Sequence, residues 1–165
     1  MRVLFLIDTL EVGGAERSLL DIIPRLRGVD PLLCQLYPGG ALRQAYERAG
    51  IPVVALDLRG RYAIARAVAG VRRVARGHRA DLIHSTLLRA DLVARAAGAL
   101  ERIPAVNSFV NDSYSPRLDG ERGRLLRAKY RAVRLLDRLT APLAAAFVAN
   151  SAATKAANCS ALGVP

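Results

Sequence analysis

The sequence predicts an α/β fold with an open parallel sheet and helices on both of its faces. Short apolar runs alternate with longer segments of helical periodicity almost from end to end, and Gly and Pro residues separate them. Strands that alternate with helices of this length form βαβ units with right-handed crossovers. With 165 residues, 52% of them hydrophobic, the chain is long enough for one folded domain with its own core.

Each predicted strand is followed by a predicted helix. The strands are expected at Val3–Ile7, Leu32–Tyr37, Val53–Leu56, Asp81–Ser85, Ala105–Phe109 and Ala146–Asn150. The helices are expected at 16–27, 41–49, 62–77, 87–100, 121–140 and about 151–162. Pro24 lies inside the first helix and is expected to kink it or end it early. The closing residues 162–165, Leu-Gly-Val-Pro, directly follow a helix, which suggests a domain of a longer protein.

The most informative local feature is the glycine pair Gly13-Gly14, within Val-Gly-Gly-Ala-Glu at residues 12–16. The pair follows the first strand and opens the first helix, so backbone N–H groups are expected at a helix N-terminus, where phosphates and other anions bind. In an open parallel sheet, ligands gather at the carboxyl ends of the strands, near the point where the strand order reverses. Gly13 and Gly14 therefore predict an anion site at that edge.

Three other phosphate-using folds fit the sequence less well. A dinucleotide site needs Gly-x-Gly-x-x-Gly and an acid after the second strand, whereas here the glycines are adjacent and that strand ends in Tyr37-Pro38. A phosphate-loop NTPase needs Gly-Lys-Ser/Thr, which does not follow these glycines. A phosphorylated receiver domain could use Asp8 and Asp57, but Thr9 stands where a second metal-binding acid is expected.

Histidines and cysteines give no sign of a metal site. Cys34 and Cys159 lie far apart and outside any ligand-spaced cluster, so reduced, structural thiols are expected. His78 lies in a basic helix end and is expected at the surface. His84 lies at the end of the fourth strand, where it is either a buried structural histidine or a ligand contact.

In this order, the segments resemble the N-terminal, acceptor-side domain of family 4 retaining glycosyltransferases, which have the GT-B fold. The resemblance implies a Rossmann-like open parallel sheet that forms one half of a GT-B enzyme. The more specific part of it is Gly-Gly-Ala-Glu after the first strand together with Asn-Ser after the sixth. The matching segments cover essentially the whole chain: 3–7, 13–17, 50–53, 81–85, 103–106, 146–151 and 162–165.

The resemblance implies an incomplete enzyme. In this family a C-terminal domain holds the nucleotide-sugar donor through a Glu-x7-Glu motif, and the N-terminal domain mainly binds the hydroxyl acceptor. Residues 1–165 would then be a single N-terminal domain whose partner is the donor-binding domain, inactive without it and using no cofactor besides the nucleotide-sugar substrate. Many relatives carry a histidine where Val110 stands here, so no catalytic residue is assigned.

The same resemblance indicates site residues. Gly13, Gly14 and Glu16 would form the loop that approaches the donor diphosphate, where preorganised N–H donors would stabilise the departing charge. The candidates on the acceptor side are His84, Thr86, Asn111, Asp112, Asn150 and Ser151.

The net charge of +11, from 25 Lys and Arg against 14 Asp and Glu, predicts an acidic partner. The helix expected at 121–140 has an apolar stripe at 125, 128, 132, 135 and 139, and beside it a basic stripe at Arg124, Arg127, Arg131, Arg134 and Arg138. Such a helix either lies on an anionic membrane surface or buries its apolar stripe and leaves the arginines in solvent. The few aromatic residues and the lack of an aromatic-interleaved basic motif argue against specific nucleic-acid binding.

No segment has the pattern of a signal peptide or of a membrane span, so a cytoplasmic protein is expected, with peripheral membrane contact left open. Two alternatives to the transferase domain remain at this point. One is a non-catalytic Rossmann-like module that binds anions or phosphates, and the other is a basic peripheral membrane-binding domain.

Overall fold

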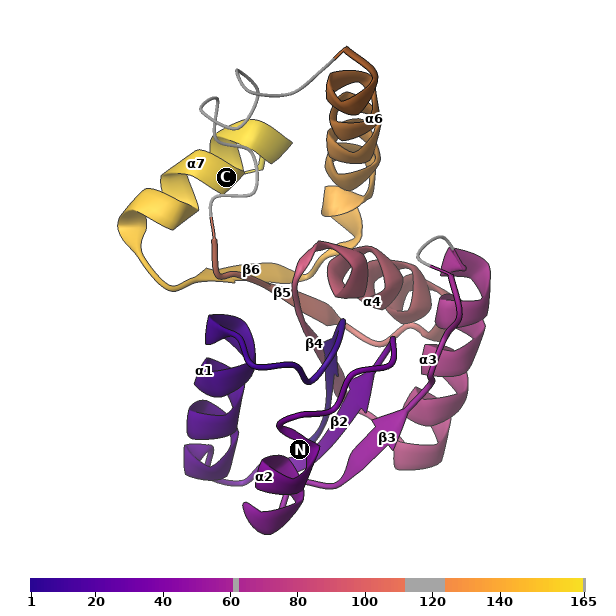
Figure 1. Cartoon of the computed structure of the whole chain (residues 1–165), viewed down its shortest axis with the longest axis vertical. Coiled ribbons are helices and arrows are strands. Elements are labelled where there is room, and N and C mark those ends of the chain that lie inside the picture. Colours follow the sequence, from indigo (N-terminus) through magenta and orange to yellow (C-terminus); the bar gives the residue numbers. More distant parts are fainter. Residues whose placement is uncertain (61–62, 112–123, 165) are drawn as a thin grey trace.

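The computed structural model of the chain contains one six-stranded, fully parallel sheet with helices packed against it (Figure 1). It describes residues 1–60, 63–111 and 124–164, with only the helical backbone for 124–130. The strands are β1 (Arg2–Ile7), β2 (Asp30–Gln35), β3 (Val53–Ala55), β4 (Leu82–Thr86), β5 (Ala105–Phe109) and β6 (Ala146–Ala149). All six predicted strands are present, so the predicted fold class is confirmed.

The helices also lie where the sequence predicts them. They are α1 (Gly14–Ile22), α2 (Arg43–Arg48), α3 (Ile64–His78), α4 (Leu88–Glu101), α6 (Arg124–Thr140) and α7 (Ala152–Leu162). Pro24 does end the first helix, because the chain tightens into a short 3-10 turn, η1 (Ile23–Arg25), around it. A second turn of the same kind, η2 (Ala141–Leu143), joins α6 to β6.

The strand order is β3-β2-β1-β4-β5-β6, so the chain builds outward from β1 in one direction and then outward from β4 in the other. The reversal falls between β1 and β4, where Ile7 lies beside Thr86 at the carboxyl ends of the two strands. Ligands of open parallel sheets bind at such a reversal. The predicted anion site therefore lies at the expected place in the topology.

The two faces of the sheet carry different helices. On one face, α1 and α2 bury Leu19 and Tyr46 against Phe5 and Leu33 of β1 and β2. On the other face, α3 and α4 bury an alanine-rich surface against the alternate strand residues: Leu4, Leu6, Cys34 and Ile83 contact Ala67, Val71, Val93 and Ala97. Alternate residues of each strand thus pack on opposite faces, as the pleat of a strand requires.

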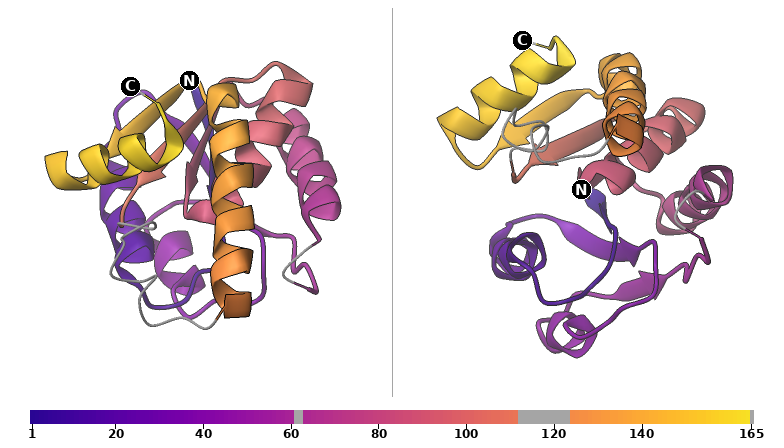
Figure 2. Two further views of the ribbon diagram at one scale, coloured as in Figure 1. Left: turned by 90° about the horizontal axis from the view of Figure 1, so that it is seen from above. Right: turned by 45° about the horizontal axis from the view of Figure 1, so that its top comes forward.

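At the β6 end of the sheet, α7 packs on the same face as α4. The rings of Phe109 and Phe147 stack there with centroids 4.8 Å apart, against Leu162 and Cys159 of α7. Figure 2 shows α6 and α7 together at this end of the molecule, away from α1 and α2. No helix among the described residues packs on the opposite face of β4, β5 and β6, although strands of a parallel sheet are normally covered on both faces.

Candidate functional site

A cavity of about 910 Å³ lies along this open face, between α1 and strands β4 to β6. Its apolar part is lined by Phe5, Leu19, Ile22, Leu82 and Val148, which come from α1 and the inner parts of the strands. Polar groups gather at the other end, which is the carboxyl edge of the sheet. The lining residues at that edge are Gly14, Thr86, Asn111 and Asn150. The cavity is therefore an apolar groove that ends in a polar corner at the strand-order reversal.

The glycine pair forms the N-terminal turn of α1 at this corner. Gly13 is the N-cap residue, with extended backbone dihedrals, and its carbonyl accepts the Arg17 N–H at 3.1 Å. The Glu16 side chain folds back over Gly13 so closely that a Cβ there would collide with its carboxylate. Gly14 differs, because a Cβ at this position would meet no atom within 4 Å and would point into open space. A side chain at Gly13 would therefore displace the Glu16 carboxylate, whereas the space beside Gly14 is available to a ligand.

Asp8, at the end of β1, ties the first half of the sheet to α4. Its carboxylate accepts the Ala90 N–H at 3.0 Å and lies 3.6 Å from the Arg89 guanidinium, so it caps the first turn of α4. Burial raises the pKa of Asp8 to about 6, against the opposing effect of Arg89, and the nearby Glu16 raises it further. A role for Asp8 here was not predicted, since the sequence suggested it only for a receiver domain.

Leu87 joins β4 to α4 with φ 81° and ψ 146°, a backbone conformation that branched side chains rarely adopt. The strained residue lines the large groove and also a small cavity behind it. Such strain is found preferentially at functional sites. The sequence does not predict this conformation, because a leucine at this position has the pattern of an ordinary core residue.

His84 lies in the floor of the groove. Its Nε2 is 2.9 Å from the Ser108 hydroxyl, and its ring meets the ring of Phe5 edge-on at 5.3 Å. Burial lowers the pKa of His84 to about 4, so the imidazole is neutral near pH 7. Its Nδ1 is buried with no hydrogen-bond partner among the described residues. His84 is therefore a packed histidine, as one interpretation of the sequence has it, and it also lines the groove. Contact with a ligand stays a prediction.

Thr86, Asn111 and Asn150, three of the acceptor-side candidates, all line the groove at the polar corner. The Thr86 hydroxyl is buried and has no partner among the described residues. The Asn150 amide donates to the Val110 carbonyl at 3.0 Å, which ties β6 to the end of β5.

Of the two remaining acceptor-side candidates, only Ser151 lies in the described part of the chain. Ser151 is the N-cap of α7, where its hydroxyl accepts the Thr154 N–H at 3.0 Å, so its contact in the structure is with its own helix. Asp112 lies outside the described residues.

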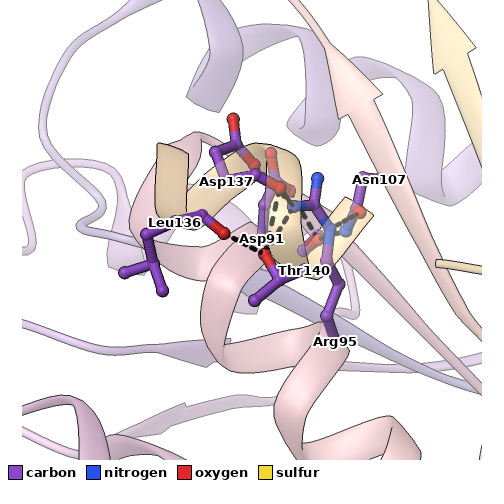
Figure 3. Close-up of polar contacts among 7 residues, drawn as sticks. Asp91, Arg95, Asn107, Leu136, Asp137 and Thr140 are labelled. Atoms are coloured by element: carbon purple, nitrogen blue, oxygen red, sulfur yellow. Dashed lines mark hydrogen bonds and ion pairs between the residues drawn. The ribbon is translucent and has the colours of Figure 1, made fainter. Parts of the chain in front are cut away.

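Behind the groove, the fully buried Arg95 of α4 holds α6 against the sheet (Figure 3). Its guanidinium donates to the Asn107 side chain at 2.6 Å and to the Asp137 carboxylate at 2.5 Å. The same group donates to the Thr140 hydroxyl at 3.1 Å and lies over the Phe147 ring, 5.4 Å from its centroid. Four elements, α4, β5, α6 and β6, thus meet at one arginine.

The network continues from Asn107 toward the strand-order reversal. The Asn107 amide donates to the Ser85 hydroxyl at 2.5 Å, which donates in turn to the Asp91 carboxylate at 2.6 Å. Burial raises the pKa of Asp91 to about 7, although Ser85 and Arg95 oppose the shift. The network fixes the start of α4 and the end of β4, directly behind the groove.

Helix α6 carries the basic stripe predicted at residues 124–138. Arg131, Arg134 and Arg138 are exposed, while the side chains of Arg124 and Arg127 lie outside the described part of the chain. Of the apolar stripe, the described residues Leu135 and Leu139 are also exposed, at 57% and 68%, so this part of the stripe is not buried against the sheet. The side chains at 125 and 128 lie outside the described residues.

The described part of the chain comprises residues 1–60, 63–111 and 124–164. It contains no group of three or more His, Cys, Asp or Glu residues placed to hold a metal ion. None of its helices combines the length and the hydrophobicity needed to cross a membrane.

The sequence matches the family model of the glycosyl transferase 4-like domain over residues 13–165. The chain belongs to this family. No protein with a curated function matches the sequence.

Solved structures with the same fold include HepE from Anabaena, in complex with UDP (27% identity, TM-score 0.76) and with UDP-glucose (28% identity, TM-score 0.76). The whole of this chain aligns with 42% and 41% of those chains, so it spans less than half of their length. The UDP-GlcNAc 2-epimerase from Neisseria meningitidis, bound to UDP-GlcNAc, aligns with the whole chain over 44% of its own length (TM-score 0.64). At 13% identity that likeness shows the fold alone. The fold is therefore that of one half of GT-B glycosyltransferases.

Proposed function

We propose that this chain is the acceptor-side half of a retaining glycosyltransferase that moves a sugar from a nucleotide-sugar donor to a hydroxyl acceptor. The observation that carries the proposal is the open space beside Gly14, at the N-terminus of α1 and at the edge of the groove. A helix N-terminus attracts negative charge through its free N–H groups and its dipole. Family membership, and the UDP and UDP-glucose in HepE, make the donor diphosphate the anion that fits.

In this proposal the chain contributes binding and charge stabilisation. Negative charge develops on the diphosphate as it leaves, and the N–H groups at Gly13 and Gly14 would stabilise that charge. The acceptor would occupy the polar corner, beside Thr86, Asn111 and Asn150. The neutral His84 can accept or donate a hydrogen bond to an acceptor hydroxyl without carrying charge. Retention of the anomeric configuration is proposed from the family resemblance alone. NMR of the product, which identifies the anomer formed, tests it.

The donor-binding half and a cytoplasmic location are parts of the same proposal. The HepE chain is more than twice as long as this chain, and its structures contain UDP or UDP-glucose, which supports a donor-binding half beyond the part that aligns with this chain. Neither Cys34 nor Cys159 forms a disulfide, which suits a reducing compartment.

Gly14→Ala tests the proposed role of the glycine loop. The new methyl group meets no protein atom, so the free energy of unfolding should stay the same or rise by up to about 1 kcal/mol. With a donor-binding domain supplied in the same polypeptide, kcat/KM for the nucleotide sugar should fall about 100-fold, because the methyl group occupies the space of the phosphate. Steady-state kinetics and thermal unfolding measure the two effects separately.

Gly77→Ala is the matched control. Gly77 lies in α3, far from the groove in the fold, and a Cβ there also meets no atom within 4 Å. Its substitution should leave kcat/KM unchanged. Equal turnover in the two variants would show that the space beside Gly14 takes no part in the reaction.

A further inference from the structure

Helix α6 presents three different faces along residues 131–140. At 3.6 residues per turn they lie about 120° apart. The inward face carries Val133, Asp137 and Thr140. A second face carries the exposed arginines Arg131, Arg134 and Arg138, and the third carries the exposed leucines Leu135, Leu136 and Leu139. We call the leucine face, with the arginine face beside it, the α6 surface.

The leucines are exposed because the inward face of α6 is polar. Arg95 binds Asp137 and Thr140 on that face, so the helix is held by ion pairing and hydrogen bonds. Arg134 fastens the arginine face to α7 through the Ala161 carbonyl at 3.3 Å. The leucine face therefore takes no part in holding α6, and Leu136 and Leu139 are 42% and 68% exposed. Leu143, in the turn that follows, is also 48% exposed.

The charge around this surface has one sign. The only acidic residue of α6 is Asp137, which is 4% exposed and paired with Arg95. No Asp or Glu follows it up to residue 165, and the neighbouring α7 adds the exposed Lys155. The α6 surface is thus apolar and cationic, with its one carboxylate turned inward.

We propose that the α6 surface binds the protein peripherally to an anionic lipid bilayer. A helix with an apolar face, a strongly basic face and low overall hydrophobicity is the form that lies in the headgroup region of a membrane. The leucines would enter the acyl boundary while Arg131 and Arg138 meet lipid phosphates, since long Arg side chains can reach the headgroups from the flank of the helix. The proposal goes beyond the proposed function, since it needs neither the glycine loop nor a donor.

Vesicle sedimentation of this chain tests the proposal. Vesicles of phosphatidylcholine alone are compared with vesicles that also contain phosphatidylglycerol, at about 0.1 M and about 1 M salt, where the Debye length is about 10 and 3 Å. Binding should require the anionic lipid and should weaken at high salt. Arg131→Gln combined with Arg138→Gln should lower the partition coefficient roughly 30-fold, which is about 1 kcal/mol for each arginine at 1.4 kcal/mol per tenfold change.

Leu135→Glu combined with Leu139→Glu should abolish binding, because carboxylates then face the lipid phosphates. The matched control is Arg73→Gln combined with Leu100→Glu, which changes an exposed arginine of α3 and a 60% exposed leucine of α4. Circular dichroism and thermal unfolding establish that all variants are folded. The control variant should bind like the natural sequence.

Three results would overturn the proposal. One is equal binding to neutral and anionic vesicles, and another is full binding by the Leu135→Glu, Leu139→Glu variant. The third is a concentration-dependent dimer that this variant abolishes, without vesicle binding by the natural chain, which would assign the α6 surface to a second copy.

Discussion

Strands β1 to β3 and strands β4 to β6 belong to one sheet, but the helices that cover them are held in different ways. Around β1 to β3 both faces are covered, and the contacts are those of an apolar core, with Leu33 and Cys34 buried on opposite sides. Around β4 to β6 one face is a groove, and the covered face depends on the buried Arg95 and its partners. Around β1 to β3 the helices are held by apolar packing. Around β4 to β6 they are held by the hydrogen bonds and ion pair of Arg95, and one face of the strands borders the groove.

The largest effect should come from Arg95→Ala. The substitution removes the Arg95 guanidinium from the buried Asp137 carboxylate, and breaking a buried ion pair costs about 3–5 kcal/mol. Urea unfolding measures the loss. The double variant Arg95→Met, Asp137→Leu should recover at least half of it, because apolar replacements remove both buried charges. If the double variant were as unstable as Arg95→Ala, burial of an unpaired charge would not be the reason.

A smaller effect is expected in the first half, from Tyr46→Phe. The buried Tyr46 hydroxyl donates to the Glu16 carbonyl at 2.5 Å and so links α2 to α1. Loss of one such hydrogen bond costs about 1 kcal/mol, since the ring still fills its place in the core. Urea unfolding under the same conditions gives the comparison with Arg95. A loss as large as that of Arg95→Ala would remove the contrast between the two halves.

The smallest effect should come from Val148→Ser in the open groove. Val148 is 53% exposed, and substitutions at such positions usually change stability by less than about 0.5 kcal/mol. Thermal unfolding of the isolated chain measures it. A loss above about 1 kcal/mol would mean that this face is already covered in the isolated chain.

The positions of the strands and helices, though not the strand order, could be predicted because their signals are local. Each strand is a short apolar run, and Pro24 ends α1 as its missing N–H requires. The start of β2 was predicted two residues late, after Pro31. Pro31 is tolerated in β2 because β3 pairs only with residues 33–35, so this part of β2 has one neighbour, β1.

The hydrogen bonds of the buried Arg95 and the strained backbone of Leu87 could not be predicted in the same way. Arg95 binds residues 12 and 42 positions away, and an arginine in a helical pattern is expected at the surface. Leu87 has its positive φ at the connection between β4 and α4, and a leucine in the sequence does not indicate such a conformation. By contrast, the loop of Gly13 and Gly14 could be predicted from the sequence. Two adjacent glycines between a strand and a helix indicate exposed backbone N–H groups at the helix N-terminus.

Helix α6 turns polar residues inward and leucines outward, and this arrangement has a consequence for the protein in solution. Exposed leucines attract one another between molecules, while a net charge of +11 keeps the molecules apart. The repulsion acts over about 10 Å at 0.1 M salt and shortens to about 3 Å at 1 M, whereas the attraction between leucines does not weaken. The colloidal stability of the isolated chain is therefore set by ionic strength, and dilute buffer is the condition in which it stays dispersed.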